Sequence, residues 1–269
     1  MRKIIVLFLL LVSSISYAWD QRQPLPPDTC NIHAPGVFQK TTVTSTICRQ
    51  GYYVGYDASA KIPKFVTYSL TPSHALGCIA RTNAFVADSS VKDGPTLADY
   101  DHSGYDRGHQ VPDGDLSWDQ QVEYESFLMT NMAPQAGSFN RGIWKLLETE
   151  VRGWVTQLKQ EYVIYVGSIY NDKDKKIGKG VVVPHAFYKV VVNTQTGEYA
   201  GWLFPHVAPY PNMGNDLTKY RATVEKIQTE SGVKFSLPPS AKELATGKEW
   251  KVDFGKLTND KRSSCSIKK

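Results

Sequence analysis

Three apolar segments follow one another between residues 161 and 205, and their close succession constrains the fold more than any other feature of the chain. The segments are rich in β-branched and aromatic residues and are bounded by turn residues, which is typical of β-strands: EYVIYVGSIY (161–170), VVVPHAFYKVVVN (181–193) and EYAGWLFP (198–205). KFVTYSL (64–70) predicts another strand. Strands that are neighbours along the chain favour antiparallel pairing over a regular alternation of strands and helices.

One helix is predicted just after residue 140. In NRGIWKLLETEVRGWVTQL the apolar side chains recur at steps of three and four residues, which gives one buried stripe, formed by Ile143, Leu146, Leu147, Val151, Trp154 and Leu158. Leu217 to Thr229 predicts a second helix that ends near Gly232, and VKFSL (233–237) predicts a short strand. The expected fold class is therefore α+β, with a mainly antiparallel central sheet and helices packed on its faces.

The first eighteen residues have the pattern of a cleavable secretory signal. MRKIIVLFLLLVSSISYA starts with Arg2 and Lys3, continues with an apolar run from Ile4 to Val12 and ends on small residues, so cleavage is predicted before Trp19. The apolar run is too short to cross a bilayer core of about 30 Å, and no later segment is long and apolar enough to do so. We expect an exported protein, periplasmic or secreted, that does not bind a membrane.

The rest of the chain divides by composition into an arm and a domain. Residues 21 to about 51 are rich in proline and polar residues, which predicts an irregular N-terminal arm over 19–55. Residues 56–269 are long enough to bury a full core as one domain with a C-terminal tail. The formal net charge is +5, and removal of residues 1–18 takes away two basic and no acidic side chains, which leaves +3. This mild positive charge permits contact with a polyanion without demonstrating it.

An even number of cysteines in an exported chain predicts disulfides. Cys30, Cys48, Cys78 and Cys265 allow three pairings. We favour Cys30 with Cys48, which are close in sequence, and Cys78 with Cys265, which would tie down the C-terminal tail. A zinc site built from four cysteines is the rival interpretation, but the chain lacks the CxxC spacing typical of such sites.

His109 is the strongest candidate for acid–base chemistry. Histidine is the side chain whose ordinary pKa, about 6.5, makes it usable as a base near neutrality. His109 lies in YDRGHQVPDGD (105–115), with Asp106 and Arg107 upstream and two aspartates downstream. The other histidines lie in loop, turn, strand or proline-rich surroundings, where a surface or structural role is more common: His33, His74, His102, His185 and His206.

Carboxamide and carboxylate side chains follow His109 on a predicted strand, a loop and the start of a helix: Asn131, Gln135, Asn140 and Glu148. A carboxamide oxygen is a hard, neutral ligand that suits Mg²⁺, which prefers oxygen and keeps several of its waters. One asparagine would suffice if water and phosphate oxygens complete the coordination. The alternative is that Asn140 only caps the helix and that Glu148 only pairs with Arg152, four residues along the same face.

Arginines flank the same segments, at Arg81, Arg107, Arg141 and Arg152. Guanidinium groups match phosphate oxygens with two parallel hydrogen bonds. A histidine base, a hard metal and several arginines together indicate phosphodiester cleavage, because one group makes the nucleophile while the others stabilise the extra negative charge on phosphorus. Isolated arginines are more often surface residues or ion-pair partners, and the sequence alone does not bring these four together.

Three blocks of the sequence resemble one family. SGYDRGHQVPDGD, FLMTNMAPQ and FNRGIWKLLETEVRGW occur in the order and spacing of the DNA/RNA non-specific endonuclease family, the ββα-metal nucleases that include endonuclease G. The resemblance runs from about Tyr56 to about Leu237, within the predicted domain. It implies that the α+β fold contains a ββα-metal active-site motif.

The resemblance also implies a role for each matching residue. His109 would be the general base that activates water, and Asn140 would bind a single Mg²⁺ directly, which Mn²⁺ could replace. Glu148 would hold a water of the metal, while Arg152 would orient Glu148 or contact phosphate. The remaining residues would stabilise the transition state, bind substrate or position catalytic groups: Arg81, Arg107, Arg141 and Asn131.

Other residues of the DRGH block are expected to support the site. Asp106 is expected to accept backbone or arginine hydrogen bonds and so to hold the loop that presents His109. Gly108 would allow close approach of the backbone. Asp113 and Asp115 are interpreted as structural, because DGD supplies too few oxygen ligands for a calcium loop.

The expected function is that of an exported, magnesium-dependent endonuclease that cleaves both DNA and RNA and leaves 5′-phosphates. Weak sequence preference is expected, because contacts to phosphate and sugar carry little sequence information. The alternatives are a secreted nucleic-acid-binding protein without catalysis and a phosphodiesterase that acts on another substrate. A protein inhibitor and a second copy of the chain are further partners that the sequence permits without specifying them.

Overall fold

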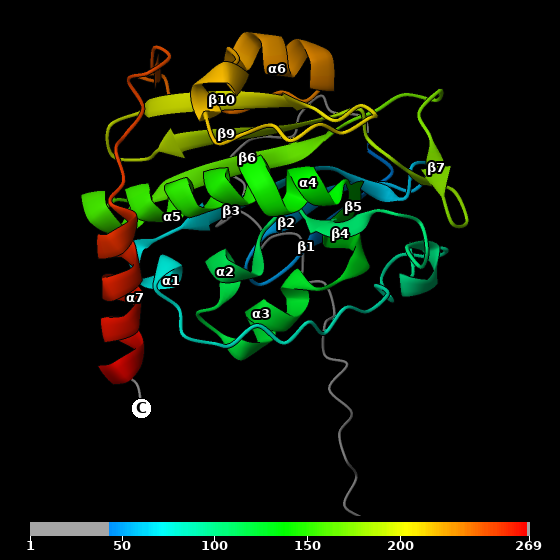
Figure 1. The fold of residues 1–269 in the computed structure, drawn as a ribbon, viewed down its shortest axis with the longest axis horizontal. Helices are drawn as coiled ribbons and strands as arrows, with labels where there is room; N and C mark the ends of the chain where they lie inside the picture. Colours follow the sequence, from blue (N-terminus) through cyan, green and yellow to red (C-terminus); the bar gives the residue numbers. More distant parts are fainter. Residues whose placement is uncertain (1–42, 268–269) are drawn as a thin grey trace, which may run out of the picture.

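A seven-stranded sheet runs through the centre of the computed structural model, which describes residues 43–267 (Figure 1). Its strands, in spatial order, are β1 (Ser45–Cys48), β2 (Tyr53–Asp57), β3 (Ile62–Leu70), β6 (Tyr162–Ile169), β9 (Ala186–Asn193), β10 (Glu198–Pro205) and β11 (Lys242–Glu243). All neighbouring strands pair antiparallel except β10 and β11, which are parallel. The predicted fold class is confirmed.

Both faces of this sheet are covered, so β6 and β9 are buried along their whole length. One face packs against α6 (Val224–Ser231), and the opposite face packs against α5 (Lys145–Leu158) (Figure 1). The alternating side chains of β6 divide between the two core clusters, with Ile164 in the cluster of α5 and Tyr165 in that of α6. A strand covered on both faces reads as a continuous apolar run, as EYVIYVGSIY does.

Shorter elements form a second layer beneath α5 (Figure 1). Two strands pair there, β4 (Asp106–His109) and β5 (Met132–Gln135), and a further pair is formed by β7 (Lys176–Ile177) and β8 (Val181–Val182). The short helices are α1 (Pro72–Ala75), η2 (Leu97–Asp99), α2 (Asp113–Leu116), α3 (Gln120–Ser126), η3 (Met129–Asn131), α4 (Gly137–Phe139), η4 (Asn140–Trp144) and η5 (Leu217–Tyr220). This layer carries most of the predicted site residues.

Three predicted elements differ from the structure for local reasons. VKFSL is not a strand, because side chains take up its backbone donors: Val233 donates to Ser231 Oγ and Phe235 donates to Gln228 Oε1. The helix predicted from 217 to 229 is interrupted, since Ala222 donates its backbone N–H to Gly201 of β10 and Thr223 then caps α6. The segment 181–193 likewise divides into β8 and β9 around Pro184.

The ends of the described chain are more regular than predicted. Residues 45–48, expected to be irregular, form β1, because Ile47 and Cys48 turn inward while the strand pairs with β2. The expected tail forms a helix, α7 (Phe254–Ile267), which lies beside α5 and α1 (Figure 1). The predicted signal and most of the predicted arm lie outside the described residues. Within residues 43–267, no helix is long and apolar enough to cross a membrane.

The disulfide predicted between Cys78 and Cys265 is confirmed. Their Cα atoms are 5.3 Å apart, and the bond joins α7 to the segment after α1 across 187 residues of sequence. Cys48 is also disulfide-bonded. Its predicted partner, Cys30, lies outside the described residues.

Candidate active site

Two short strands and the helix that follows bring the predicted residues together. β4 pairs antiparallel with β5, so that Gly108 lies opposite Ala133. The chain then runs through α4, η4 and α5 from Gly137 to Leu158, with a kink at Gly142. A side chain at position 108 would not fit, because a Cβ there would lie 2.3 Å from the side chain of Gln135. This is the ββα arrangement that the resemblance implied.

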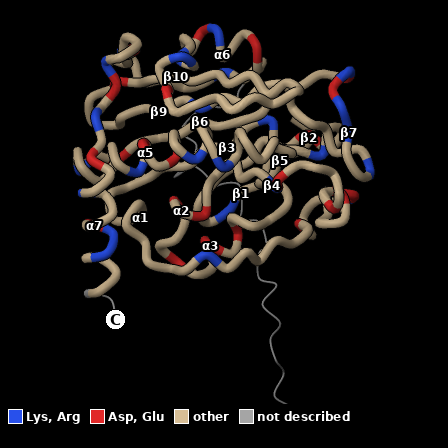
Figure 2. The backbone as a smooth tube through the Cα atoms, viewed as in Figure 1, with Lys and Arg blue, Asp and Glu red and all other residues tan. Residues whose placement is uncertain are grey.

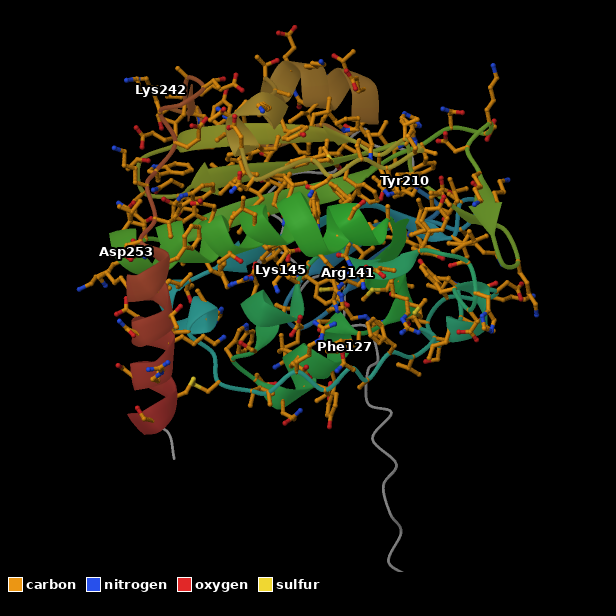
Figure 3. All side chains as sticks on the ribbon, in the orientation of Figure 1. Phe127, Arg141, Lys145, Tyr210, Lys242 and Asp253 are labelled. Carbon is orange, nitrogen blue, oxygen red and sulfur yellow. A yellow bond between two sulfur atoms is a disulfide. The ribbon has the colours of Figure 1, made fainter. Side chains whose placement is uncertain are left out.

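A hollow of about 380 Å³ opens between β4, α2 and α5. It brings together seven of the predicted site residues: Arg81, Arg107, His109, Asn140, Arg141, Glu148 and Arg152. Figure 3 shows Arg141 and Lys145 on the side of the helix that faces the layer of Phe127. The predicted candidates Asn131 and Gln135 do not line this hollow and are fully buried behind it.

His109 lies at the back of this hollow between two aromatic rings. The rings of Phe85 and Phe127 contact it edge-on, with centroids at 5.5 and 5.0 Å. Its Nε2 atom has no hydrogen-bond partner among residues 43–267. Burial lowers the pKa of His109 to about 3, and the charges of Arg81 and Arg107 act in the same direction. The imidazole is therefore neutral near pH 7, as a proton acceptor must be.

Asn140 presents a carboxamide whose two ends differ. Its Nδ2 donates to Asp106 Oδ2 at 3.0 Å, which fixes the orientation of the amide, while its Oδ1 accepts no hydrogen bond within the described chain. Asp106 also lies 3.4 Å from Arg141 Nε, as expected for a residue that accepts from arginine. Asn140 has helical backbone angles, and the kink at Gly142 separates it from α5, whose N-cap is Trp144. The interpretation that it caps the helix is wrong.

Glu148 is a buried carboxylate on α5, only 9% exposed. Burial raises its pKa to about 7, although the charges of Lys189 and Arg152 lower it. No ion pair joins Glu148 to Arg152 in the described structure, because the Arg152 guanidinium instead donates to Asp115 Oδ1 at 2.7 Å. The alternative that Glu148 only pairs with Arg152 is therefore wrong.

Asp113 and Asp115 hold arginines of the site. Asp115 accepts from Arg152 and, through its other oxygen, from the Tyr68 hydroxyl at 2.6 Å. Asp113 forms an ion pair with Arg81, whose Nε donates to Asn83 Oδ1. These contacts confirm the structural interpretation of the two aspartates.

Two of the arginines that face the hollow are partly exposed, although each lies beside an aspartate. The side chain of Arg141 is 74% exposed and that of Arg81 is 43% exposed. Arg107 stacks over the ring of Phe85 at 4.4 Å, and Arg81 stacks over the ring of Phe127 at 4.9 Å. Stacking holds a guanidinium in place while leaving its edge free to bind an anion.

Asn131 supports the site from behind. Its side chain accepts from the backbone N–H of Val111 and donates to the carbonyls of Val111 and Ser126. It thus holds the chain two residues after His109. His206, predicted to be structural, donates from Nδ1 to the carbonyl of Pro184 and accepts the Ala136 N–H at Nε2.

Two lysines at or near the site were not predicted from the sequence. Lys145 lines the hollow one helical turn after Arg141, and this i, i+4 spacing was a signal that could have found it. Lys189 was missed for a different reason. It lies in an apolar strand, is 1% exposed and has its Nζ 4.5 Å from the centroid of the Trp144 ring, a contact that no local pattern predicts.

Protein ligands for a metal are few in this hollow. No group of three or more histidine, cysteine, aspartate or glutamate side chains in the described residues could hold a metal ion. The free Asn140 Oδ1 and the unpartnered carboxylate of Glu148 nevertheless fit a hard cation that keeps most of its waters and takes few protein ligands. The donor set is therefore compatible with Mg²⁺ and unlike that of a zinc site.

A neutral buried histidine, an oriented carboxamide and several cations around one hollow define a phosphodiester-cleaving enzyme of the nuclease class. The family model described as DNA/RNA non-specific endonuclease matches residues 33–241. The chain belongs to this family, which accounts for the ββα arrangement of the site. The match begins within the predicted N-terminal arm and ends before α7.

Relatives and a solved structure agree with this assignment. Nuclease 1, mitochondrial, of Schizosaccharomyces pombe is 29% identical over 68% of this chain and 63% of its own length. A nuclease of Nostoc is 29% identical over 75% of this chain and 76% of its own length. A structure described as the EndoG/EndoGI complex superimposes with a TM-score of 0.64 at 26% identity and covers 72% of this chain and 86% of that one.

The comparisons contradict the predicted location. Besides the Schizosaccharomyces pombe protein, a nuclease of Saccharomyces cerevisiae and endonuclease G of Homo sapiens are named as mitochondrial. The prediction of an exported, periplasmic or secreted protein is therefore wrong. It rested on the basic start, the apolar run from Ile4 to Val12 and the small residues that follow, but transit peptides are also basic. This pattern did not decide the destination.

Proposed function

We propose that this protein is a magnesium-dependent endonuclease that hydrolyses phosphodiester bonds of both DNA and RNA and leaves 5′-phosphates. The observation that carries the proposal is His109, a buried and neutral imidazole whose Nε2 has no hydrogen-bond partner among residues 43–267, in a hollow surrounded by arginines. Cations on the rim suit a polyanion. Contacts to phosphate are common to DNA and RNA.

In the proposed reaction, His109 accepts a proton from the attacking water. Burial is the main cause of its low pKa, and the charges of Arg81 and Arg107 add to it. A substrate phosphate that neutralises these two charges would remove their part of the shift and so favour protonation. The same arginines would stabilise the charge that develops on the phosphoryl oxygens. Proton transfer and charge stabilisation would thus be coupled through the same three side chains.

Asn140 and Glu148 would hold the metal ion. Asn140 would contribute its free Oδ1, held in place by Asp106, and Glu148 would bind one of the metal's waters. A bound Mg²⁺ would supply positive charge at the scissile phosphate and would help to orient it. Arg152 would keep its bond to Asp115 and support Glu148 through its charge.

The proposal is tested by digesting supercoiled plasmid and total RNA, with Mg²⁺ or with EDTA. We compare the wild type with His109→Ala, Asn140→Ala and the control His74→Ala, whose ring stacks on Trp118 away from the hollow. The wild type and the control should degrade both substrates with Mg²⁺ only. Loss of a general base should lower the rate by about 10² to 10⁴.

The outcomes separate the alternatives. If the wild type binds nucleic acid without cleaving it in Mg²⁺ or Mn²⁺, the protein is a binding protein and the proposal fails. Cleavage of small phosphodiesters but not of plasmid or RNA would indicate another substrate class. Full activity of folded His109→Ala would reject this residue as the base.

A protein inhibitor is proposed as a partner by analogy only. The similar solved structure is described as a complex that explains EndoG inhibition, which supports a protein inhibitor as a partner of this chain. A homodimer is a further prediction that no observation on this chain tests.

A further inference from the structure

A second hollow adjoins the one that contains His109. It has a volume of about 440 Å³ and shares four lining residues with the first: Arg81, Arg107, Asn140 and Arg141. The two hollows therefore form one continuous depression, with the proposed metal ligand at the boundary. A polymer whose phosphate lies beside Asn140 would have to continue along this depression.

The far wall of the second hollow is a loop held in one shape. Asp99 accepts the backbone N–H groups of Thr96 and Lys179, at 2.8 and 2.6 Å, and Tyr105 donates its N–H to Ser103 Oγ. His102 has a left-handed backbone conformation (φ 54°) at the turn and is exposed. These contacts present the imidazole at the rim without any rearrangement of the loop.

The lining has the chemistry of a site for sugar and phosphate. The guanidinium groups of three arginines and the His102 imidazole can donate to phosphate oxygens. The carboxylates of Asp101 and Asp106 lie in the same lining and can accept hydrogen bonds from sugar hydroxyls. Lys175 adds a cation 4.9 Å over the ring of Tyr105, which lines the hollow. At its base, the Tyr100 hydroxyl is buried and has no hydrogen-bond partner among the described residues. Buried polar groups without a partner are rare and call for a ligand or a water.

We propose that the second hollow binds the nucleotide next to the scissile phosphate, with His102 donating a hydrogen bond to that nucleotide's own phosphate. This inference rests on the proposed nuclease function and names a contact that the family resemblance did not assign. Since the contact is made to phosphate, the subsite accepts any base. Affinity then depends on the length of the substrate rather than on its sequence.

The test measures binding in a background that does not cleave. We introduce His102→Gly into the His109→Ala protein and measure the affinity for fluorescein-labelled octathymidylate by anisotropy in Mg²⁺. Glycine suits the left-handed backbone of position 102, so the loop keeps its shape. The matched control is Lys159→Gly, which removes a cationic side chain from a left-handed position at the far end of α5. Lys175→Gln serves as a second variant in the subsite.

His102→Gly should weaken binding by about five- to tenfold, the size expected for one hydrogen bond to a charged group near the surface, and Lys175→Gln should weaken it less. The control should remain within about twofold of the parent. Parental affinity in both subsite variants would overturn the inference. Plasmid cleavage by the otherwise wild-type protein is measured in parallel: if cleavage is absent while His102→Gly still weakens binding, the nuclease proposal fails and the subsite stands.

Discussion

At the scale of single residues, burial shifts two titrating groups of the site in opposite directions, and each shift favours the uncharged form. The pKa of His109 falls to about 3, while that of Glu148 rises to about 7. Both side chains lie in the hollow that would receive a polyanion. A bound metal or anion would change these environments. In the free protein, burial of the two groups lowers the stability of the fold, as is common for residues of functional sites.

The loss of stability caused by burying the Glu148 carboxylate can be measured from the pH dependence of the free energy of unfolding. A carboxyl group whose pKa is higher in the folded than in the unfolded state stabilises the fold below its unfolded pKa, about 4.3, and that stability is lost as the pH rises through about 7. From Glu148 alone, stability should therefore fall by about 1–3 kcal/mol between pH 4.5 and 7.5. The lowered pKa of His109 acts in the opposite direction below about pH 6.5, so the comparison of wild type with Glu148→Gln isolates the carboxyl group. Glu148→Gln cannot ionise and should lack this loss.

Urea unfolding in metal-free buffer at the two pH values measures this difference. Glu225→Gln, an exposed position on α6, should retain the pH dependence of the wild type. An identical pH dependence in Glu148→Gln and the wild type would contradict the burial argument. The same variant should lose most of its nuclease activity if Glu148 holds a water of the metal.

At the scale of elements, the pairing of β4 with β5 depends on one glycine. Gly108→Ala would place a methyl group 2.3 Å from the Gln135 side chain, inside a pair of buried strands. The strands would have to separate, at a cost of about 1–3 kcal/mol, and His109 would move with them. We expect a lower melting temperature and a large fall in kcat.

The control for this prediction is Gly94→Ala, where the nearest atoms lie 3.4 Å away in ordinary contact. Thermal unfolding and plasmid cleavage of both variants provide the comparison. If Gly108→Ala were as active and as stable as the control, the close approach of the two strands would not be needed.

Helix α7 is attached at both ends. Near its start Asp253 exchanges two hydrogen bonds with Gln157 of α5, and near its end the Cys78–Cys265 bond joins it to the segment after α1. Lys261 also donates to Ser117, at the end of α2. Helix α7 thus packs against one side of the layer that contains the site.

Removal of this disulfide should weaken the fold more than the catalysis. The bond spans 187 residues, and loss of such a constraint should cost about 2–5 kcal/mol. Thermal unfolding of Cys78→Ser/Cys265→Ser should show a lower midpoint, with activity at 25 °C largely kept because α7 does not line the hollow. An unchanged midpoint would show that α7 remains docked without the bond.

At the scale of the whole molecule, basic and acidic residues are mixed along the part of the chain that faces the viewer in Figure 2. Four cationic side chains converge at the hollow: Arg81, Arg107, Arg141 and Lys145. The local density of cationic side chains at the hollow, rather than the net charge of +5, should therefore govern binding to nucleic acid.

Salt dependence tests this view. Each phosphate contact to duplex DNA contributes about −0.9 to the slope of log K against log salt. Arg141→Gln or Lys145→Gln, in the His109→Ala background, should each reduce the slope by about that amount. Lys242→Gln should leave it unchanged, since Lys242 lies across the sheet from Arg141 (Figure 3). Equal slopes in all three variants would mean that binding is spread over the surface.

The sequence by itself determined the class of fold and the positions of most elements. The apolar runs over β6 and β10 and the three- and four-residue steps of α5 are local patterns, and each one predicted its element correctly. The DRGH block also identified His109, because the charged residues that flank the histidine are its neighbours in the sequence and can be recognised without the fold.

Only the tertiary structure decided how distant residues meet. Asp115 binds Arg152 and Tyr68, Lys189 lies beneath Trp144, and the tail folds as α7 against α5, in each case across long stretches of sequence. Such contacts depend on how layers pack, and a side chain carries no local signal of which partner it will find. The pKa values of His109 and Glu148 follow the same rule, since they arise from burial that only the assembled layers produce.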